Sequence, residues 1–163
     1  MMRWIQHLFL DDFAARRAFP RACLKAIERT IIAQEVRHRG ELRFVVEGGL
    51  TLPLMLARRT ARERAIELFS QLRIWDTEGN AGVLIYLLLA YRRVEIVADR
   101  GIDAKVGHAA WDAICGAMQR EFAEGRFEAG AILGIAAISD LLAEHFPPGE
   151  VNPNELPDAP VML

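Results

Sequence analysis

The chain has 163 residues, the length of one typical domain. Charged residues make up 26% of it and hydrophobic residues 52%, which is the composition of a globular protein and excludes wholesale disorder. The formal net charge of −2 gives no overall basic field for nucleic acid, and no stretch approaches the roughly 20 apolar residues of a membrane-spanning helix.

The first segment, residues 1–18, is expected to be an amphipathic helix. Its apolar face consists of residues that recur at helical spacing: Trp4, Leu8, Phe9 and Phe13. Arginines flank this face, so the helix can lie on an anionic membrane surface or in a partner's groove. Alternatively, it folds back onto the domain and buries its apolar side. The apolar run 4–10 is too short for a signal peptide, so we expect a cytoplasmic protein, with membrane association as the open alternative.

A helix, a strand and a long helix are predicted next. The helix covers 20–38, the alternating pattern of 41–47 predicts a largely covered strand, and one long helix follows over 51–73. The two cysteines, Cys23 and Cys115, fall in apolar helical patterns. We expect them to be buried thiols rather than a disulfide.

The second half of the sequence predicts a β-hairpin and two helices. The apolar run 82–89 is typical of a central strand, and 93–98 follows after a tight connection as its antiparallel partner. Two helices separated by Gly125 complete a domain over 19–147, and the proline-rich tail 148–163 is expected to be extended and mobile. The fold class is therefore α/β, a three-layer α/β/α sandwich around a small mixed sheet with a βαβ crossover and an antiparallel hairpin.

Topology brings oxygen-bearing side chains to one rim of this sheet. Three of them precede the second strand, namely Asp76, Glu78 and Asn80, and Asp99 follows the third strand. Asp103 lies close by in the sequence. Carboxylate and amide oxygens on turns suit hard cations, so these four are candidate ligands for Ca²⁺ or Mg²⁺. The alternative is a solvated turn in which the side chains bond their own backbone.

Other kinds of site have weaker support. Gly48 and Gly49 precede a helix and could offer amides to an anion, but Glu47 repels one, so a tight turn is favoured. The histidines do not cluster as zinc ligands, and no serine lies in a nucleophile elbow. A run of arginines is interpreted as a solvated helix face rather than a nucleic-acid site: Arg58, Arg59, Arg62 and Arg64.

Several of these segments resemble the TPM-domain family. They are the Asn-Ala-Gly-Val-Leu start of the second strand at 80–84, the third strand with its glycine-bearing turn at 93–102, and the Phe-x-x-Gly-x-x-x-x-Gly linkage at 122–130. The likeness covers about 21–146 and is greatest to short bacterial members that have no signal peptide or membrane anchor. It implies an α/β/α sandwich.

The resemblance also implies functions and partners. Divalent-cation binding is suspected in several bacterial relatives, and acid phosphatase activity in some plant relatives. In bacteria such proteins often accompany a LemA-type membrane protein and a longer, exported TPM protein, which are therefore the expected protein partners.

Two hypotheses for function follow. The favoured one is a non-catalytic binding or interaction module with a divalent-cation site, because no nucleophile, histidine cluster or nucleotide loop is visible. The alternative is a metal-dependent, acid phosphatase-like hydrolase, in which the rim residues hold a cation that polarises a phosphoryl oxygen and Arg100 contacts the phosphate.

Overall fold

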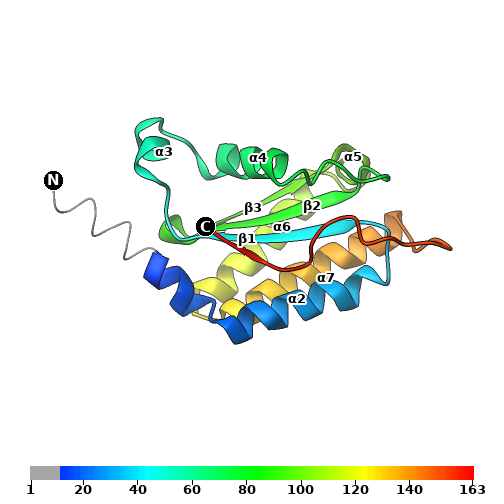
Figure 1. Ribbon diagram of the computed structural model, residues 1–163, viewed down its shortest axis with the longest axis horizontal. Coiled ribbons are helices and arrows are strands. Elements are labelled where there is room, and N and C mark those ends of the chain that lie inside the picture. The colour runs from blue at the N-terminus through cyan, green and yellow to red at the C-terminus, as the bar shows by residue number, and fades with distance from the viewer. Residues whose placement is uncertain (1–11) are drawn as a thin grey trace.

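The structure is a computed structural model that describes residues 12–163 (Figure 1). It begins with a helical stretch over 12–18. The elements that follow are α2 (Arg21–Glu35), β1 (Glu41–Glu47), α3 (Leu52–Leu56), α4 (Ala61–Gln71), β2 (Gly82–Leu88), the 3₁₀ turn η1 (Leu89–Tyr91), β3 (Arg93–Ala98), α5 (Arg100–Val106), α6 (His108–Ala123), α7 (Phe127–His145) and β4 (Val161–Met162).

The strands form one mixed sheet in the order β3-β2-β1-β4. β1 and β2 are parallel, with Glu41 opposite Gly82, and β3 returns antiparallel to β2, as the crossover and hairpin patterns predict. All seven residues of β2 are buried, because helices cover both of its faces. The predicted α/β sandwich is therefore confirmed.

The two faces of the sheet carry cores of different size. α2, α6 and α7 cover one face, where Phe44, Ile85 and Leu87 of the sheet meet the apolar stripes of the helices (Figure 1). α4 covers the other face over Leu84 and Tyr86. The side chains of each strand alternate between the two cores, as the period of two in a strand requires.

The segment between β1 and β2 corrects one prediction. The sequence predicts a single helix over 51–73, but the structure has the short α3 and then α4, separated at 57–60. Thr60 accepts a hydrogen bond from the Glu63 amide, and the Glu63 side chain bonds the Thr60 amide, which is a capping box that starts a new helix. Arg58 has a left-handed backbone with φ of 52°, which ends the earlier turn.

The C-terminal tail, predicted to be extended, packs on the domain. β4 runs parallel to β1 opposite Val45 and Val46. The backbone amides of Glu155 and Leu156 each donate to the Glu41 carboxylate at 3.1 Å. A two-residue strand leaves no periodic signal in the sequence, which is why the pattern did not reveal it.

The predicted N-terminal helix, residues 1–18, falls only partly within the described residues, and Trp4, Leu8 and Phe9 lie outside them. Within the described part, Ala15 is buried in the larger core, whereas Phe13 is 65% exposed. This stretch therefore both packs on the domain and presents an aromatic side chain to solvent.

Candidate functional site

The turn before β2 and the start of α5 meet at one rim of the sheet. The Gly101 amide donates to the Asn80 carbonyl at 2.9 Å, and the Asp99 amide donates to the Gly82 carbonyl at 2.8 Å. A Cβ atom at position 101 would lie 2.5 Å from the Asn80 oxygen, so this close approach requires glycine. Asn80 and Asp99 therefore lie on neighbouring turns.

Asp99 is the most enclosed of the four predicted ligands, at 6% exposure. Its Oδ1 accepts from the Arg100 amide at 2.7 Å and caps α5. Its Oδ2 is buried and has no hydrogen-bond partner among the described residues. A buried carboxylate oxygen without a partner is costly, and a bound cation would compensate it.

The other predicted ligands make different contacts. Asp76 pairs with Arg73 at 2.6 Å in an exposed turn, and the amide of Glu78 donates to the Glu155 carboxylate at 3.0 Å. Asp103 accepts a hydrogen bond from the indole of Trp111 at 2.9 Å. Within residues 12–163, no three or more His, Cys, Asp or Glu side chains form a group that could hold a metal ion.

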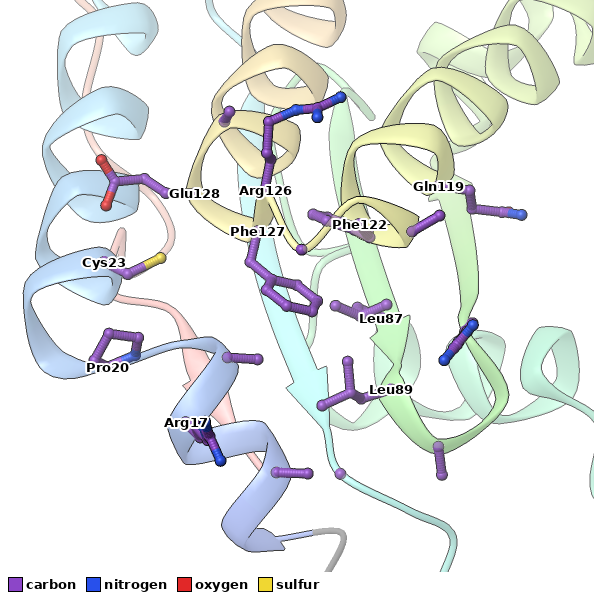
Figure 2. A pocket seen from close by; sticks show the side chains of 18 of the residues that line it. Arg17, Pro20, Cys23, Leu87, Leu89, Gln119, Phe122, Arg126, Phe127 and Glu128 are labelled. Atoms are coloured by element: carbon purple, nitrogen blue, oxygen red, sulfur yellow. The ribbon is translucent and has the colours of Figure 1, made fainter.

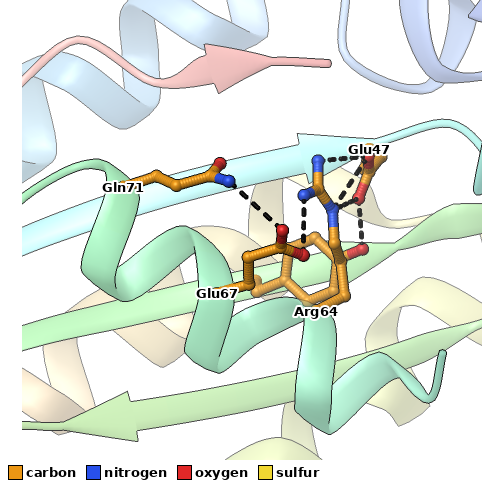
Figure 3. Close-up of polar contacts among 5 residues, drawn as sticks. Glu47, Arg64, Glu67 and Gln71 are labelled. Carbon is orange, nitrogen blue, oxygen red and sulfur yellow. Dashed lines mark hydrogen bonds and ion pairs between the residues drawn. The ribbon is translucent and has the colours of Figure 1, made fainter. Parts of the chain in front are cut away.

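A buried polar network joins β1, β2 and α4 (Figure 3). The Tyr86 hydroxyl donates to Glu47 Oε2 at 2.5 Å, and Arg64 Nη2 donates to Glu47 Oε1 at 2.9 Å. Arg64 also pairs with Glu67 at 3.2 Å. Arg64 was predicted on a solvated helix face, but its side chain is only 12% exposed, because Glu47 on the strand beneath attracts it.

This network holds β1, β2 and α4 together. Burial first, and then the hydrogen bond to Glu47, raise the pKa of Tyr86 far above its ordinary value, so the phenol keeps its proton. Both oxygens of Glu47 already accept hydrogen bonds from Arg64 or Tyr86. The sequence did not reveal these contacts, because the partners are 17 and 39 positions from Glu47.

A second set of ionisable side chains joins β1 to the tail and to α2. Arg43 is 6% exposed and donates to the carbonyls of Pro157 and Ala159. Glu35 Oε1 accepts from the Leu42 amide at 3.0 Å. Burial, followed by the nearby Glu41 carboxylate, raises the pKa of Glu35 to about 9, so Glu35 is protonated at neutral pH.

A large hollow lies at the opposite end of the sheet from the Asn80 rim. It measures about 1190 Å³ and is bounded by the 12–18 helix, the end of β2 with η1, and the turn between α6 and α7 (Figure 2). Phe122 and Phe127 stack in its wall with ring centroids 5.7 Å apart, and Phe127 lies 5.4 Å from Phe19. We refer to this hollow as the aromatic cavity.

Charged residues also line the aromatic cavity. Arg126 pairs with Glu121 at 2.7 Å, whereas Arg17 and Arg92 are exposed and form no ion pair within the described part of the chain. Burial, and then Glu128, raise the pKa of the Cys23 thiol in the wall to about 11, so this thiol is not an activated nucleophile. The cavity can thus receive apolar groups that carry a negative charge.

A family model described as the TPM domain matches residues 16–141 of the chain. The chain belongs to the TPM-domain family. The matched range contains β1 to β3 and most of the helices, and so includes both the Asn80 rim and the aromatic cavity. None of the curated protein sequences compared with it matches.

Two solved structures are similar to this TPM domain. BA42 protein from the psychrophilic bacterium Bizionia argentinensis is 29% identical, with a TM-score of 0.77 over 87% of this chain and 93% of that protein. The N-terminal domain of a P. gingivalis protein is 18% identical, with a TM-score of 0.63 over 80% of this chain and 82% of that domain. The second likeness shows the fold alone. Within residues 12–163, no helix combines the length and apolar character that a membrane span requires.

Proposed function

We propose that this TPM-domain protein is a non-catalytic binding module that docks an apolar, carboxylate-bearing segment of a protein partner in the aromatic cavity. The observation that carries the proposal is the cavity itself, a hollow of about 1190 Å³ with stacked phenylalanines in its wall. A hollow of this size with apolar walls is the usual form of a binding site.

The chemistry of the cavity defines the partner segment. Apolar side chains that enter it gain about 25 cal/mol for each Å² removed from water. Arg17 and Arg92 at its edge suit a carboxylate on the same segment. The partners that the family resemblance implies, a LemA-type membrane protein or an exported TPM protein of the same organism, are the first to test.

A titration with variants tests this proposal. Arg17→Glu reverses one charge at the edge, and Ala123→Arg places a long side chain in the cavity at an exposed position. Each should weaken calorimetric binding of the partner about tenfold or more. Arg29→Glu, an exposed position on α2 outside the cavity, is the matched control and should bind like wild type. Measurable binding that neither cavity variant weakens would contradict the proposal.

We further propose that Asn80 and Asp99 contribute to a divalent-cation site at the rim, with Asp76 and Glu78 as outer ligands for Ca²⁺ or Mg²⁺. The support is the buried Oδ2 of Asp99, which lacks a partner among the described residues. Calcium or magnesium titration should shift the amide signals of 78–82 and 99–103 in a saturable way. Asp99→Asn keeps the cap on α5 but removes the charge, and should abolish these shifts; saturable shifts that persist in this variant would exclude Asp99 as a ligand.

Phosphatase-like hydrolysis is the second candidate function. The model that matches this chain is named for a phosphatase, and the exposed Arg100 adjoins Asp99, where it could contact a phosphate held by the cation. This candidate ranks below the binding module, because its chemistry depends on a cation bound at the rim, whereas docking in the aromatic cavity does not.

A further inference from the structure

The short helix α3 exposes apolar side chains. All five of its residues are leucine, proline or methionine, and none is buried. Leu52 is 42% exposed, Met55 38% and Leu56 75%. Figure 1 shows α3 at one end of the molecule, beyond the ends of β1 and β2. Clustered apolar side chains at a tip indicate contact with an apolar medium or partner.

The same end is strongly basic. Residues 48–62 contain three arginines and no Asp or Glu, and residues 88–94 contain two arginines and no Asp or Glu. These two segments line a common hollow of about 390 Å³. The chain as a whole has a net charge of −2, so this end differs in sign from the molecule's average.

Few of these arginines are neutralised. Arg62 and Arg93 share one carboxylate, that of Glu95, at 3.7 and 3.6 Å. Arg58 and Arg59 are exposed and form no ion pair with any residue from 12 to 163. Two guanidinium groups next to exposed leucines are thus available to an external anion.

One aromatic side chain completes the surface. Tyr91 of η1 is 53% exposed and lines the same hollow as Met55 and Arg58. Tyrosine, with an apolar ring and a polar tip, is enriched where a protein meets the boundary between lipid and water. We call these residues the α3 face: Leu52, Met55, Leu56, Arg58, Arg59 and Tyr91.

We propose that the α3 face docks on the surface of an anionic lipid bilayer. The leucines and Met55 enter the boundary of the acyl chains, while Arg58 and Arg59 bind lipid phosphates. A nucleic acid would supply phosphates to pair with the arginines, but no apolar environment for Leu56. An anionic bilayer supplies both the phosphates and the apolar environment. The proposal goes beyond the docking of a protein partner, because the residues of the α3 face do not line the aromatic cavity.

Vesicle sedimentation with the full chain tests this proposal. The probe is vesicles of phosphatidylcholine mixed with phosphatidylglycerol, compared with pure phosphatidylcholine. The wild-type protein should bind the anionic vesicles and not the neutral ones, and added salt should weaken the binding, since exposed charges are screened.

Two variants separate the apolar and the basic contributions. Leu56→Gln removes an exposed apolar side chain, and Arg58→Asn with Arg59→Gln removes two charges while asparagine tolerates the left-handed backbone of position 58. Each should reduce vesicle affinity about tenfold. Val36→Gln at the C-cap of α2 is the matched control for Leu56, because Val36 is 70% exposed, and it should bind like wild type.

The proposal is overturned if the wild-type protein does not bind anionic vesicles or binds neutral ones equally well. It is also overturned if neither variant binds anionic vesicles more weakly than wild type. Thermal melting of each variant checks that it is folded; the altered side chains are exposed, so the melting temperatures should match. Arg17→Glu, which alters the aromatic cavity, should retain vesicle binding, so failure of the cavity proposal and failure of this one are distinguishable.

Discussion

At the scale of single residues, the buried charges are the unusual feature of this domain. Three of the seven residues of β1 are charged and buried, namely Glu41, Arg43 and Glu47. Each is matched by a partner on another element, since an unpaired charge in the core would be costly. The charges on β1 therefore define which segments cover it: α4 near Glu47, and the tail near Glu41.

The Glu47 network gives a prediction for stability. Arg64→Met keeps the apolar stem but leaves a buried carboxylate without its cation, so the free energy of unfolding should fall by about 3–5 kcal/mol. Tyr86→Phe removes one donor and should cost about 1–3 kcal/mol. Urea unfolding measures both. Arg73→Met breaks an exposed pair and is the control, with no measurable change expected; equal effects of all three variants would refute this account.

Asp99 gives a prediction for activity. Hydrolysis of generic phosphate esters in the presence of Mg²⁺ should stay at background, because no activated nucleophile is present in the described structure. Colorimetric assays of wild type and Asp99→Asn check this. Robust turnover that disappears in Asp99→Asn would reverse the order of the two candidate functions.

At the scale of elements, the end of α2 and the tail respond to pH through Glu35. Its folded pKa is about 9, against an ordinary value of 4.5, because burial and Glu41 disfavour the charged form. The unfolded chain therefore releases a proton that the folded chain keeps, and stability falls as pH rises from about 4.5 to about 9.

A neutral substitution should remove this dependence. Glu35→Gln has no proton to lose, so its stability relative to wild type should increase as pH rises through that window, measured by urea unfolding at several pH values. His38 has the opposite effect at lower pH. Burial lowers its pKa to about 4, so the free energy of unfolding decreases as pH falls below 6.5. Glu144→Gln on the exposed side of α7 is the control; a pH profile of Glu35→Gln parallel to wild type would refute the prediction.

Truncation of the tail gives another prediction at this scale. Removing 150–163 deletes β4, uncovers the edge of β1 and leaves Glu41 and Arg43 without their hydrogen-bond partners. We expect a loss of several kcal/mol in the free energy of unfolding, and self-association through the open strand edge, seen by size-exclusion chromatography. A truncated chain that stays monomeric and melts like wild type would show that the tail is dispensable.

The elements also show what a sequence pattern can reveal. β2 and the stripes of α6 and α7 were predictable because apolar periodicity reports burial directly. The break between α3 and α4 was predictable in principle from Thr60 and Glu63, which match a capping box. β4 and the Glu47–Arg64 pair were not, since they arise from contacts between segments distant in sequence.

At the scale of the whole molecule, the two ends of the sheet differ. One end carries the Asn80 rim, whose approximate position follows from strand topology alone. The other carries the aromatic cavity and the α3 face, which no motif indicates, because the cavity is lined by four separate segments and the α3 face combines two. A binding site assembled in this way becomes visible only once the fold is known.

The most direct test of the account maps where a partner binds. Isotope-labelled full chain is titrated with the soluble region of the LemA-type protein, and separately with the exported TPM protein, while amide signals are followed. We predict saturable shifts at 89–92 and 122–128, around the aromatic cavity, with at least one of them. Shifts confined to 78–82 and 99–103 at the opposite rim, or no saturable shifts with either protein, would contradict the proposal that a partner docks in the aromatic cavity.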